Sequence, residues 1–416
     1  MTKLEKLIKD LCPNGMEYKS FGELATICRG ASPRPIKNYI TNDENGVNWI
    51  KIGDVSVGSK YITNTAEKIT IEGAKKSRKV KKGNFILSNS MSFGRPYILD
   101  IDGCIHDGWL AISDFQDYYL TDFLYYLLNS SSVQNEMKKR ASFGGAVQNL
   151  NADIVRALQL PVLPLEVQRE IVRILDNFTE LTAELTAELT AELTARKKQY
   201  EYYRDMLLDF GSECEWSKLG EIATVTKLAG FEFTSYVQYT DEGTIIALRG
   251  LNVKNGHLVL DDVKYIDGSD LSKLNRSKLV IDDMLFTYVG TVGQVALITE
   301  NNKYYLAPNV ALIRLSDKKI IPRFMMYYFQ STHLYKKQVM KLMQNSSMQN
   351  LTMEKIRKLV LPIPSIPEQE RIIGILDRFD KLCNDISEGL PAEIEARRKQ
   401  YEYYRDKLLS FEEVRM

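Results

Sequence analysis

The chain contains an internal repeat that covers most of its length. Residues 195–210 recur as residues 396–411, with thirteen of sixteen positions identical. The same offset of 201 relates Gln168 to Gln369, and residues 148–150 to residues 349–351. Chance does not produce such a match, so the 416 residues are two tandem copies of about 200 residues each. Two copies are too few for a solenoid, and we therefore expect a pseudo-two-fold molecule.

The two copies are not repeated evenly. The tails, roughly residues 164–210 and 365–411, are closely alike, whereas the bodies, roughly residues 17–160 and 213–361, match only in outline. Divergent bodies on repeated tails suggest a common scaffold that carries two different readers, that is, two domains with different recognition surfaces. Simple drift after the duplication is the alternative.

The tails have the sequence pattern of long helices. Residues 165–210 contain neither proline nor glycine, which predicts a helix that ends with Gly211 as its C-cap. At ~1.5 Å per residue this helix would be roughly 70 Å long. The second tail is interrupted at residues 387–391, which predicts a break and a restart with Pro391 in the first turn. Apolar side chains in the first tail recur at spacings of three and four, at Ile171, Leu175, Phe178, Leu181, Leu185, Leu189 and Leu193.

A tetrapeptide, Thr-Ala-Glu-Leu, occurs three times in succession at residues 182–193. Glu184, Glu188 and Glu192 repel one another at i,i+4 spacing, so intrinsic propensity alone does not stabilise this helix. We expect its leucines to pack on the second tail. An ordinary amphipathic segment is one interpretation of the repeat. The other interpretation is that the repeat acts as a ruler, a helical spacer whose length changes in units of four residues.

The bodies have a mixed α and β pattern. Residues 83–98 and 283–298 each read as a strand, a polar glycine-containing loop and a second strand. Helical stretches rich in tyrosine and leucine follow, and polar loops at residues 142–151 and 344–352 close the bodies. The fold class is therefore α+β, with a division into residues 1–160 (body one, with a short leader helix), 161–212, 213–364 (body two) and 365–416.

The motifs of a self-contained active site are absent from the sequence. The chain has no phosphate-binding P-loop, no dinucleotide loop, no nucleophile elbow and no Asn-Pro-Pro-aromatic segment of amino-methylating enzymes. His106, His257 and His333 are isolated, so we assign no metal ligands and no catalytic residues. No apolar run is long enough to span a membrane, and the five scattered cysteines fit a reducing cytoplasm. A binding or scaffold subunit is the favoured class.

The net charge of +1 conceals an uneven distribution. The segments 1–160 and 213–365 each carry +4, whereas 161–212 carries −4 and 366–416 carries −3. The charge distribution therefore allows the basic bodies to bind a polyanion. The acidic tails are poor candidates for binding phosphate.

Candidate DNA contacts combine basic side chains with polar side chains in loops, because Arg reads guanine and Asn reads adenine in the major groove. Residues 75–82 carry six basic residues in eight and could neutralise phosphates, although a solvated charged turn is the alternative. The candidates in body one are Lys51, Lys75, Lys76, Arg78, Asn89, Ser90, Ser92 and Arg95. Those in body two are Arg249, Asn252, Lys254, Arg276, Lys278, Tyr288, Thr291 and Gln294.

The duplicated Arg-Lys-Gln-Tyr-Glu-Tyr-Tyr-Arg-Asp segments, the Thr-Ala-Glu-Leu repeats and the loops that end in Gln-Asn-Leu resemble the specificity subunit of type I restriction–modification systems. The likeness covers essentially the whole chain. It implies that each body is a target-recognition domain for one half of a split, asymmetric double-stranded DNA sequence. It also implies that the tails form an antiparallel helical pair that separates the two domains.

The resemblance further implies partners that carry the chemistry. Two modification subunits would supply S-adenosylmethionine binding and adenine methylation, and up to two motor-nuclease subunits would supply ATP- and magnesium-dependent translocation and cleavage. This cytoplasmic chain would hold no cofactor and contact no membrane. The residues expected in the spacer and in subunit docking are Leu181, Leu185, Leu189, Leu193, Tyr200, Tyr203, Tyr401 and Tyr404. The rival hypotheses are a coiled-coil scaffold without a DNA role, and a methyltransferase that acts alone.

Overall fold

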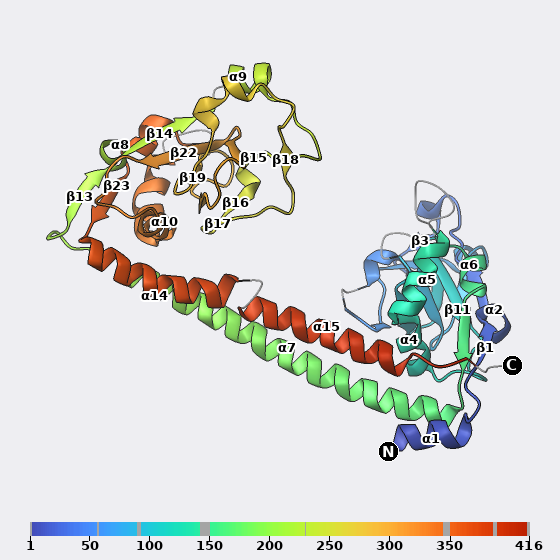
Figure 1. The fold of residues 1–416 in the computed structure, drawn as a ribbon. Helices are drawn as coiled ribbons and strands as arrows, with labels where there is room; N and C mark the ends of the chain where they lie inside the picture. The colour runs from blue at the N-terminus through green and yellow to red at the C-terminus, as the bar shows by residue number, and fades with distance from the viewer. Residues whose placement is uncertain are drawn as a thin grey trace. The chain divides into compact units, whose positions relative to one another are not determined.

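The computed structural model describes residues 2–55, 58–89, 93–141, 150–228, 230–343, 350–385 and 389–413. The chain forms two compact units (Figure 1). Unit 1 consists of Met1–Glu188 and Ile394–Met416, and unit 2 of Leu189–Glu393. Each unit therefore holds one body together with parts of both tails. The division of the sequence at residues 160, 212 and 364 stays a prediction.

The body of unit 1 is built on two five-stranded sheets, with strand orders β2-β11-β8-β9-β5 and β3-β6-β4-β10-β7. Strands β1 and β12 form a separate antiparallel pair that closes the body. The strands are β1 (Glu17–Ser20), β2 (Thr26–Arg29), β3 (Ile40–Thr41), β4 (Val47–Ile50), β5 (Tyr61–Ile62), β6 (Glu67–Ile69), β7 (Arg78–Val80), β8 (Phe85–Ser88), β9 (Pro96–Leu99), β10 (Gly103–Ile105), β11 (Trp109–Ser113) and β12 (Gln159–Val162). The helices are α1 (Lys3–Leu11), α2 (Phe21–Leu24), α3 (Ile71–Lys75), α4 (Thr121–Asn129), α5 (Ser131–Ala141) and α6 (Ala152–Arg156), with 3-10 turns η1 (Ile36–Asn38) and η2 (Ile52–Asp54).

The body of unit 2 follows the same plan with fewer strands. Its sheets have the orders β14-β22-β19-β20 and β18-β15-β21, with pairs β13-β23 and β16-β17. The strands are β13 (Glu215–Lys218), β14 (Ala223–Lys227), β15 (Ile246–Leu248), β16 (Val253–Lys254), β17 (His257–Leu258), β18 (Lys264–Tyr265), β19 (Met284–Thr287), β20 (Val295–Leu297), β21 (Tyr304–Leu306), β22 (Val310–Leu315) and β23 (Val360–Ile363). The helices are α8 (Leu219–Ile222), α9 (Gly230–Tyr236), α10 (Pro322–Gln330), α11 (Thr332–Leu334), η7 (Tyr335–Val339), α12 (Met340–Met343) and α13 (Met353–Arg357), with 3-10 turns η4 (Gly250–Asn252), η5 (Leu271–Lys273) and η6 (Asn275–Ser277).

The shared pairings confirm the mixed α/β class and the tandem duplication. In both bodies the predicted strand–loop–strand element is an antiparallel hairpin, β8–β9 in one and β19–β20 in the other. In both, a parallel pair lies in the second sheet, β4 with β10 and β15 with β21. The helical stretches predicted after the hairpins are α4 and α10.

Both faces of the central sheet are buried, which explains its nearly continuous apolar strands. In β8, Phe85 and Leu87 enter the core that includes α4 and α5, whereas Ile86 enters the core toward the second sheet. In β19, Met284 and Phe286 face the helical core, and Leu285 faces the other. This two-sided packing fixes the strand register, because a one-residue slip would exchange the two faces.

The tails are helical, as predicted. The first is a single helix, α7 (Leu165–Leu207), and the second consists of α14 (Ile366–Asn384) and α15 (Leu390–Leu408), which restarts with Pro391 in its first turn. Among the described residues, no helix combines the length and the apolarity that a bilayer crossing requires.

The predicted end of the first helix at Gly211 is wrong. Helix α7 ends at Leu207, and Leu208 is buried in the core of unit 2. Phe210 packs against Phe324, with ring centroids 6.1 Å apart. Burial of Leu208 and packing of Phe210 against the same core turn the chain out of the helix before the glycine.

The tails pair in antiparallel order. Within unit 1, Phe178 stacks on Tyr404 with ring centroids 6.0 Å apart, and the Thr179 Oγ1 and Tyr401 hydroxyl oxygens lie 2.9 Å apart. Within unit 2, Phe379 stacks on Tyr203 of α7 at 5.6 Å. Partner numbers fall as the numbers in α7 rise, which confirms the predicted direction.

A fully buried glutamine joins each body to its own tail helix. The Gln168 Oε1 accepts a hydrogen bond from Leu120 N at 2.9 Å, and its Nε2 donates to Tyr118 O and Leu163 O. Gln369 makes the same three bonds in unit 2, to Ile321 N, Lys319 O and Pro364 O.

A hydrogen-bonded tyrosine–aspartate pair also occurs in each unit, with its aspartate further along the same tail helix. The Tyr126 hydroxyl of α4 donates to Asp176 Oδ1 at 2.7 Å, and the Tyr327 hydroxyl of α10 donates to Asp377 Oδ1. Burial and the neighbouring carboxylate raise the pKa of both tyrosines far above their usual value, so the two hydroxyls stay protonated donors.

The variant Gln168→Leu tests the glutamine anchor. It removes the partner of one backbone N–H and of two carbonyls, one of which (Leu163 O) lies in a fully buried bond, so we expect the free energy of unfolding of unit 1 to fall by about 3 kcal/mol. The exposed Gln116→Leu is the matched control, with an expected change within about 0.5 kcal/mol. In a Trp216→Phe background, Trp49 and Trp109 fluorescence during urea unfolding reports on unit 1 alone. Equal midpoints for the two variants would show that the anchor contributes nothing.

Candidate nucleic-acid interface

In each body the same backbone hydrogen bond joins the two ends of the loop of the central hairpin. Gly94 N donates to Ser88 O, and Gly293 N donates to Thr287 O, both at 2.9 Å. The glycines have φ of +69° and +94°, a region that side chains with a Cβ rarely adopt. These bonds make Arg95 of one loop the counterpart of Gln294 in the other. The match of residues 83–98 with residues 283–298 in the sequence is therefore shifted by one residue at this loop. Two predicted contacts in the first loop, Ser90 and Ser92, lie outside the described residues.

A second loop is a 3-10 turn that follows a basic residue. In unit 1, Asp54 Oδ2 accepts from Lys51 N at 2.7 Å, and in unit 2, Asn252 Oδ1 accepts from Arg249 N at 3.0 Å. Lys51 and Arg249 are therefore structural equivalents. Asn252 is fully buried, and its Nδ2 also donates to Val259 O and Asp262 O, each at 2.8 Å.

A third loop precedes the last strand of the central sheet. Asn89 N donates to Gly108 O at 3.1 Å, and Tyr288 N donates to Asn309 O at 3.3 Å. The sequence analysis missed this loop. Its two versions, Asp107-Gly108 and Pro308-Asn309, share the offset of 201 and turn-forming residues, which is the signal that could have identified it.

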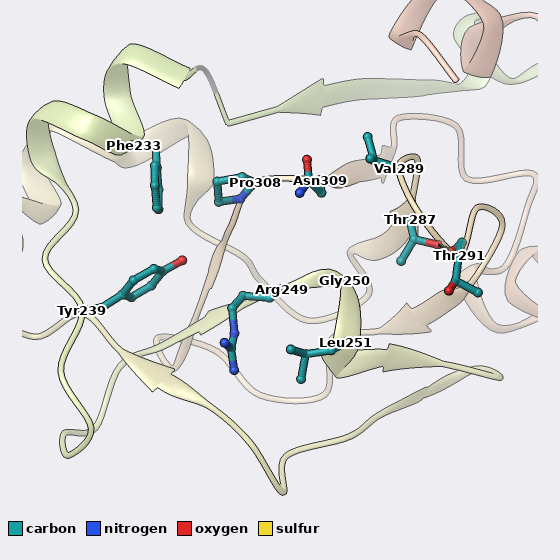
Figure 2. A pocket seen from close by; sticks show the side chains of 10 residues that line it. All are labelled: Phe233, Tyr239, Arg249, Gly250, Leu251, Thr287, Val289, Thr291, Pro308 and Asn309. Atoms are coloured by element: carbon teal, nitrogen blue, oxygen red, sulfur yellow. Dashed lines mark hydrogen bonds between the residues drawn. The ribbon is translucent and has the colours of Figure 1, made fainter. Parts of the chain in front are cut away.

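In unit 2 the three loops surround a cavity of about 520 Å³ (Figure 2). The Arg249 Nη2 donates to Asp262 Oδ1 at 2.7 Å, and the Thr287 hydroxyl donates to Thr291 O at 2.5 Å. The remaining lining combines aromatic and apolar side chains with a few polar groups, which is typical of a ligand site. The lining residues are Phe233, Tyr239, Arg249, Gly250, Leu251, Thr287, Val289, Thr291, Pro308 and Asn309.

In unit 1 the corresponding loop carries a polar network. The Ser32 hydroxyl donates to Asp107 Oδ1 at 2.7 Å, and Arg34 lies 3.6 Å from the same carboxylate. The hydrogen bond from Ser32 is the largest cause that lowers the pKa of Asp107, and burial lowers the pKa of the adjacent His106. At neutral pH this loop therefore presents a carboxylate beside an uncharged imidazole.

Several predicted contacts are exposed to solvent. The exposed side chains are Lys75, Lys76, Arg78, Arg95, Lys254, Arg276 and Thr291. Lys76 Nζ donates to the Tyr39 hydroxyl at 2.6 Å, and Arg78 Nε donates to Arg29 O at 3.1 Å, so both are oriented by the body. The basic stretch spans the end of α3 and the start of β7.

The other predicted contacts take part in internal interactions. Lys51 Nζ pairs with Glu67 at 2.8 Å, and Gln294 Oε1 accepts from Asn255 N at 3.0 Å. Tyr288 and Lys278 are half-buried. Asn89 is buried and its Nδ2 donates to Asp107 O at 3.0 Å, so Asn89 and Asn252 support loops with their amides in this structure. A DNA contact by any of these residues stays a prediction.

The predicted spacer residues pack mostly within the chain. Leu189 and Tyr200 are buried, Leu185, Leu193, Tyr203 and Tyr401 are half-buried, and Leu181 and Tyr404 are exposed. Tyr200 and Tyr203 both stack on Phe379. Docking of a partner subunit by these residues stays a prediction.

The chain matches a family model described as the type I restriction modification DNA specificity domain twice, at residues 13–195 and 211–396. It is 35% identical over 257 residues to the type I restriction enzyme EcoR124I/EcoR124II specificity subunit of Escherichia coli, which covers 60% of this chain and 61% of that protein. It is 34% identical over 264 residues to a putative type I restriction enzyme specificity subunit of Haemophilus influenzae, covering 62% and 65%. The chain thus spans less than two thirds of these two relatives.

A solved structure has the same fold. A chain from a study of complex assembly and conformational transition of the type I restriction–modification system superposes with a TM-score of 0.69. The superposition covers 96% of this chain and 98% of that chain, at 16% identity.

The variant Asn252→Asp tests whether one amide holds the second loop of unit 2. It keeps the acceptor for Arg249 N but places a carboxylate against two carbonyl oxygens, so we expect the loop to lose about 2–3 kcal/mol of local stability. Hydrogen exchange of residues 249–262 should then accelerate by about 30- to 150-fold. Asn301→Asp is the control, because Asn301 only accepts a hydrogen bond, from Ile281 N. Unchanged protection in Asn252→Asp would contradict this role.

Proposed function

Because the chain belongs to the family of type I restriction–modification DNA specificity domains, we propose that it reads a bipartite DNA sequence, one half with each body. In this proposal the chain is a non-catalytic subunit. Its helical tails dock two modification subunits, and up to two restriction subunits join the complex. Those partners carry the S-adenosylmethionine, ATP and magnesium, and the complex methylates adenine and cleaves DNA.

The observation that carries this proposal is a matched loop framework with different side chains. The three loops are held by equivalent hydrogen bonds in both units, two by backbone bonds and one by a side-chain oxygen that accepts from the backbone, but the residues they present differ. Arg95 is equivalent to Gln294, Lys51 to Arg249, and Gly108 to Asn309. Two readers with one framework and different contact residues are what an asymmetric target requires, since base edges are distinguished by side-chain donors and acceptors.

The exposed basic stretch of body one supplies a place for the phosphate backbone. Lys75, Lys76 and Arg78 are all exposed, and neutralisation of phosphates by such side chains provides affinity without sequence information. The base-reading role is therefore assigned to the three loops, and the backbone-positioning role to this stretch.

The Thr-Ala-Glu-Leu repeats are proposed to set the unread spacer between the half-sites. The boundary between the two units falls between Glu188 and Leu189, inside the repeats. Four helical residues rotate the chain by ~400°, which is ~40° beyond a full turn. One base pair rotates DNA by ~36°. One repeat therefore corresponds in rotation to about one base pair.

Deletion of residues 186–189 tests this function and the ruler together. Methylated adenines are mapped in cells that express the chain with its modification subunits. We expect the wild-type chain to give one bipartite motif, and the deletion to give the same half-sites with a spacer about one base pair shorter. Glu188→Gln, which keeps the helix length, should leave the spacer unchanged. An unaltered spacer in the deletion would refute the ruler, and the lack of any bipartite motif in the wild type would refute the function.

A further inference from the structure

The cavity of unit 2 contains one side-chain amide that no described residue hydrogen-bonds. Asn309 follows Pro308 and immediately precedes β22, and its backbone oxygen accepts from Tyr288 N. Its side chain is exposed and lines the cavity (Figure 2). The amide is therefore held on a fixed backbone with its donor and acceptor unused by the described part of the chain.

Two other polar groups of the cavity are already engaged within the chain. Arg249 is paired with Asp262, and the Thr287 hydroxyl donates to Thr291 O. Arg249 is the only charged residue in the lining, and its pairing weakens the attraction of this site for phosphate. Among the lining residues, Asn309 alone offers an amide, which pairs bidentately with N6 and N7 of adenine in the major groove.

Two exposed apolar side chains line the same cavity as the amide. Leu251 is 51% exposed and Val289 is 38% exposed, and both line the same cavity. A cavity that offers a free amide together with an exposed leucine and valine matches the two features of an A·T pair in the major groove, the adenine N6/N7 edge and the thymine methyl group.

The equivalent position of unit 1 has no room for such a side chain. A Cβ added at Gly108 would lie 2.1 Å from the His106 ring, so the residue there presents only backbone. At this position of the shared framework, body one therefore presents only the backbone of Gly108, whereas body two presents the side-chain amide of Asn309.

From these observations we infer that Asn309 is a specificity-determining residue that reads the adenine of an A·T pair in the half-site of body two, with Leu251 and Val289 against the thymine methyl. This inference rests on the proposed function, because it assigns a base pair to one of the two readers.

Two substitutions at Asn309 separate base reading from a purely conformational role. The residue has φ +70°, which asparagine tolerates and glycine adopts freely. Asn309→Gly therefore keeps the turn and removes the amide. Asn309→Asp keeps the shape but loses the donor, and a carboxylate accepts from cytosine N4 instead. Asn302→Gly is the matched control, since Asn302 is also exposed with φ +59° and lies outside the cavity lining.

The test maps adenine methylation by the complete complex of each variant with its modification subunits. We expect the preference for A·T at one position of one half-site to fall about tenfold or more in Asn309→Gly, with a shift toward C·G in Asn309→Asp. The other half-site should be unchanged, and the remaining positions of the same half-site should also be read, which shows that body two of each variant still folds. On duplexes of the mapped target, deoxyuridine in place of the thymine of that pair should weaken binding of the wild-type complex several-fold.

The outcomes distinguish the two levels of the proposal. The complex with Asn309→Gly can recognise both half-sites in the same way as the wild type and the Asn302→Gly control. In that case Asn309 only forms the turn, and the inference is wrong while the proposed function stands. If the wild-type complex methylates no bipartite sequence, the proposed function fails and the inference falls with it.

Discussion

The structure depends on the attachment of each body to its own tail helix through buried hydrogen bonds. Gln168 and Gln369 each make hydrogen bonds to three backbone groups. Two of these groups belong to the segment that precedes α4 or α10 in the body, and the third lies just before the tail helix. Tyr126 and Tyr327 add a second attachment to aspartates of the tails. Because a buried polar group without a partner is costly, these anchors fix how a body is mounted on its tail within each unit. The same anchors occur twice at an offset of 201, so the mounting is duplicated together with the scaffold.

A rigid framework allows the loops to differ. The central sheet is buried on both faces in each unit, and the alternation of Phe85, Ile86 and Leu87 between two cores leaves little freedom in its register. The loops at the strand ends are held by backbone hydrogen bonds, with Gly94 and Gly293 in the conformation the turn requires. Since these bonds involve the backbone, and the second loop needs only one bonded side chain, Asp54 or Asn252, the other side chains of the loops are free to change. This explains why the bodies match only in outline while the tails match closely.

Sequence reasoning predicted the repeated features better than the unique ones. The duplication, the helical tails, the restart at Pro391 and the paired hairpins follow from periodicity and from residues with restricted backbone conformations. The end of α7 was misplaced because burial of Leu208, a tertiary effect, overrides the local glycine signal. The burial of Asn252 and the exposure of Asn309 could not be distinguished in the sequence. Both are polar residues next to turns, and only the fold shows which amide is enclosed and which lines a cavity.

The central claim is that the chain holds two independent readers on a shared scaffold, and a body exchange tests it most directly. Residues 213–364 are replaced by the corresponding body of a relative with a different target, and methylated adenines are mapped with the complete complex. The account predicts that one half-site changes to that of the donor while the other half-site is retained. Loss of both half-sites in a complex that still assembles, or retention of both, would contradict it.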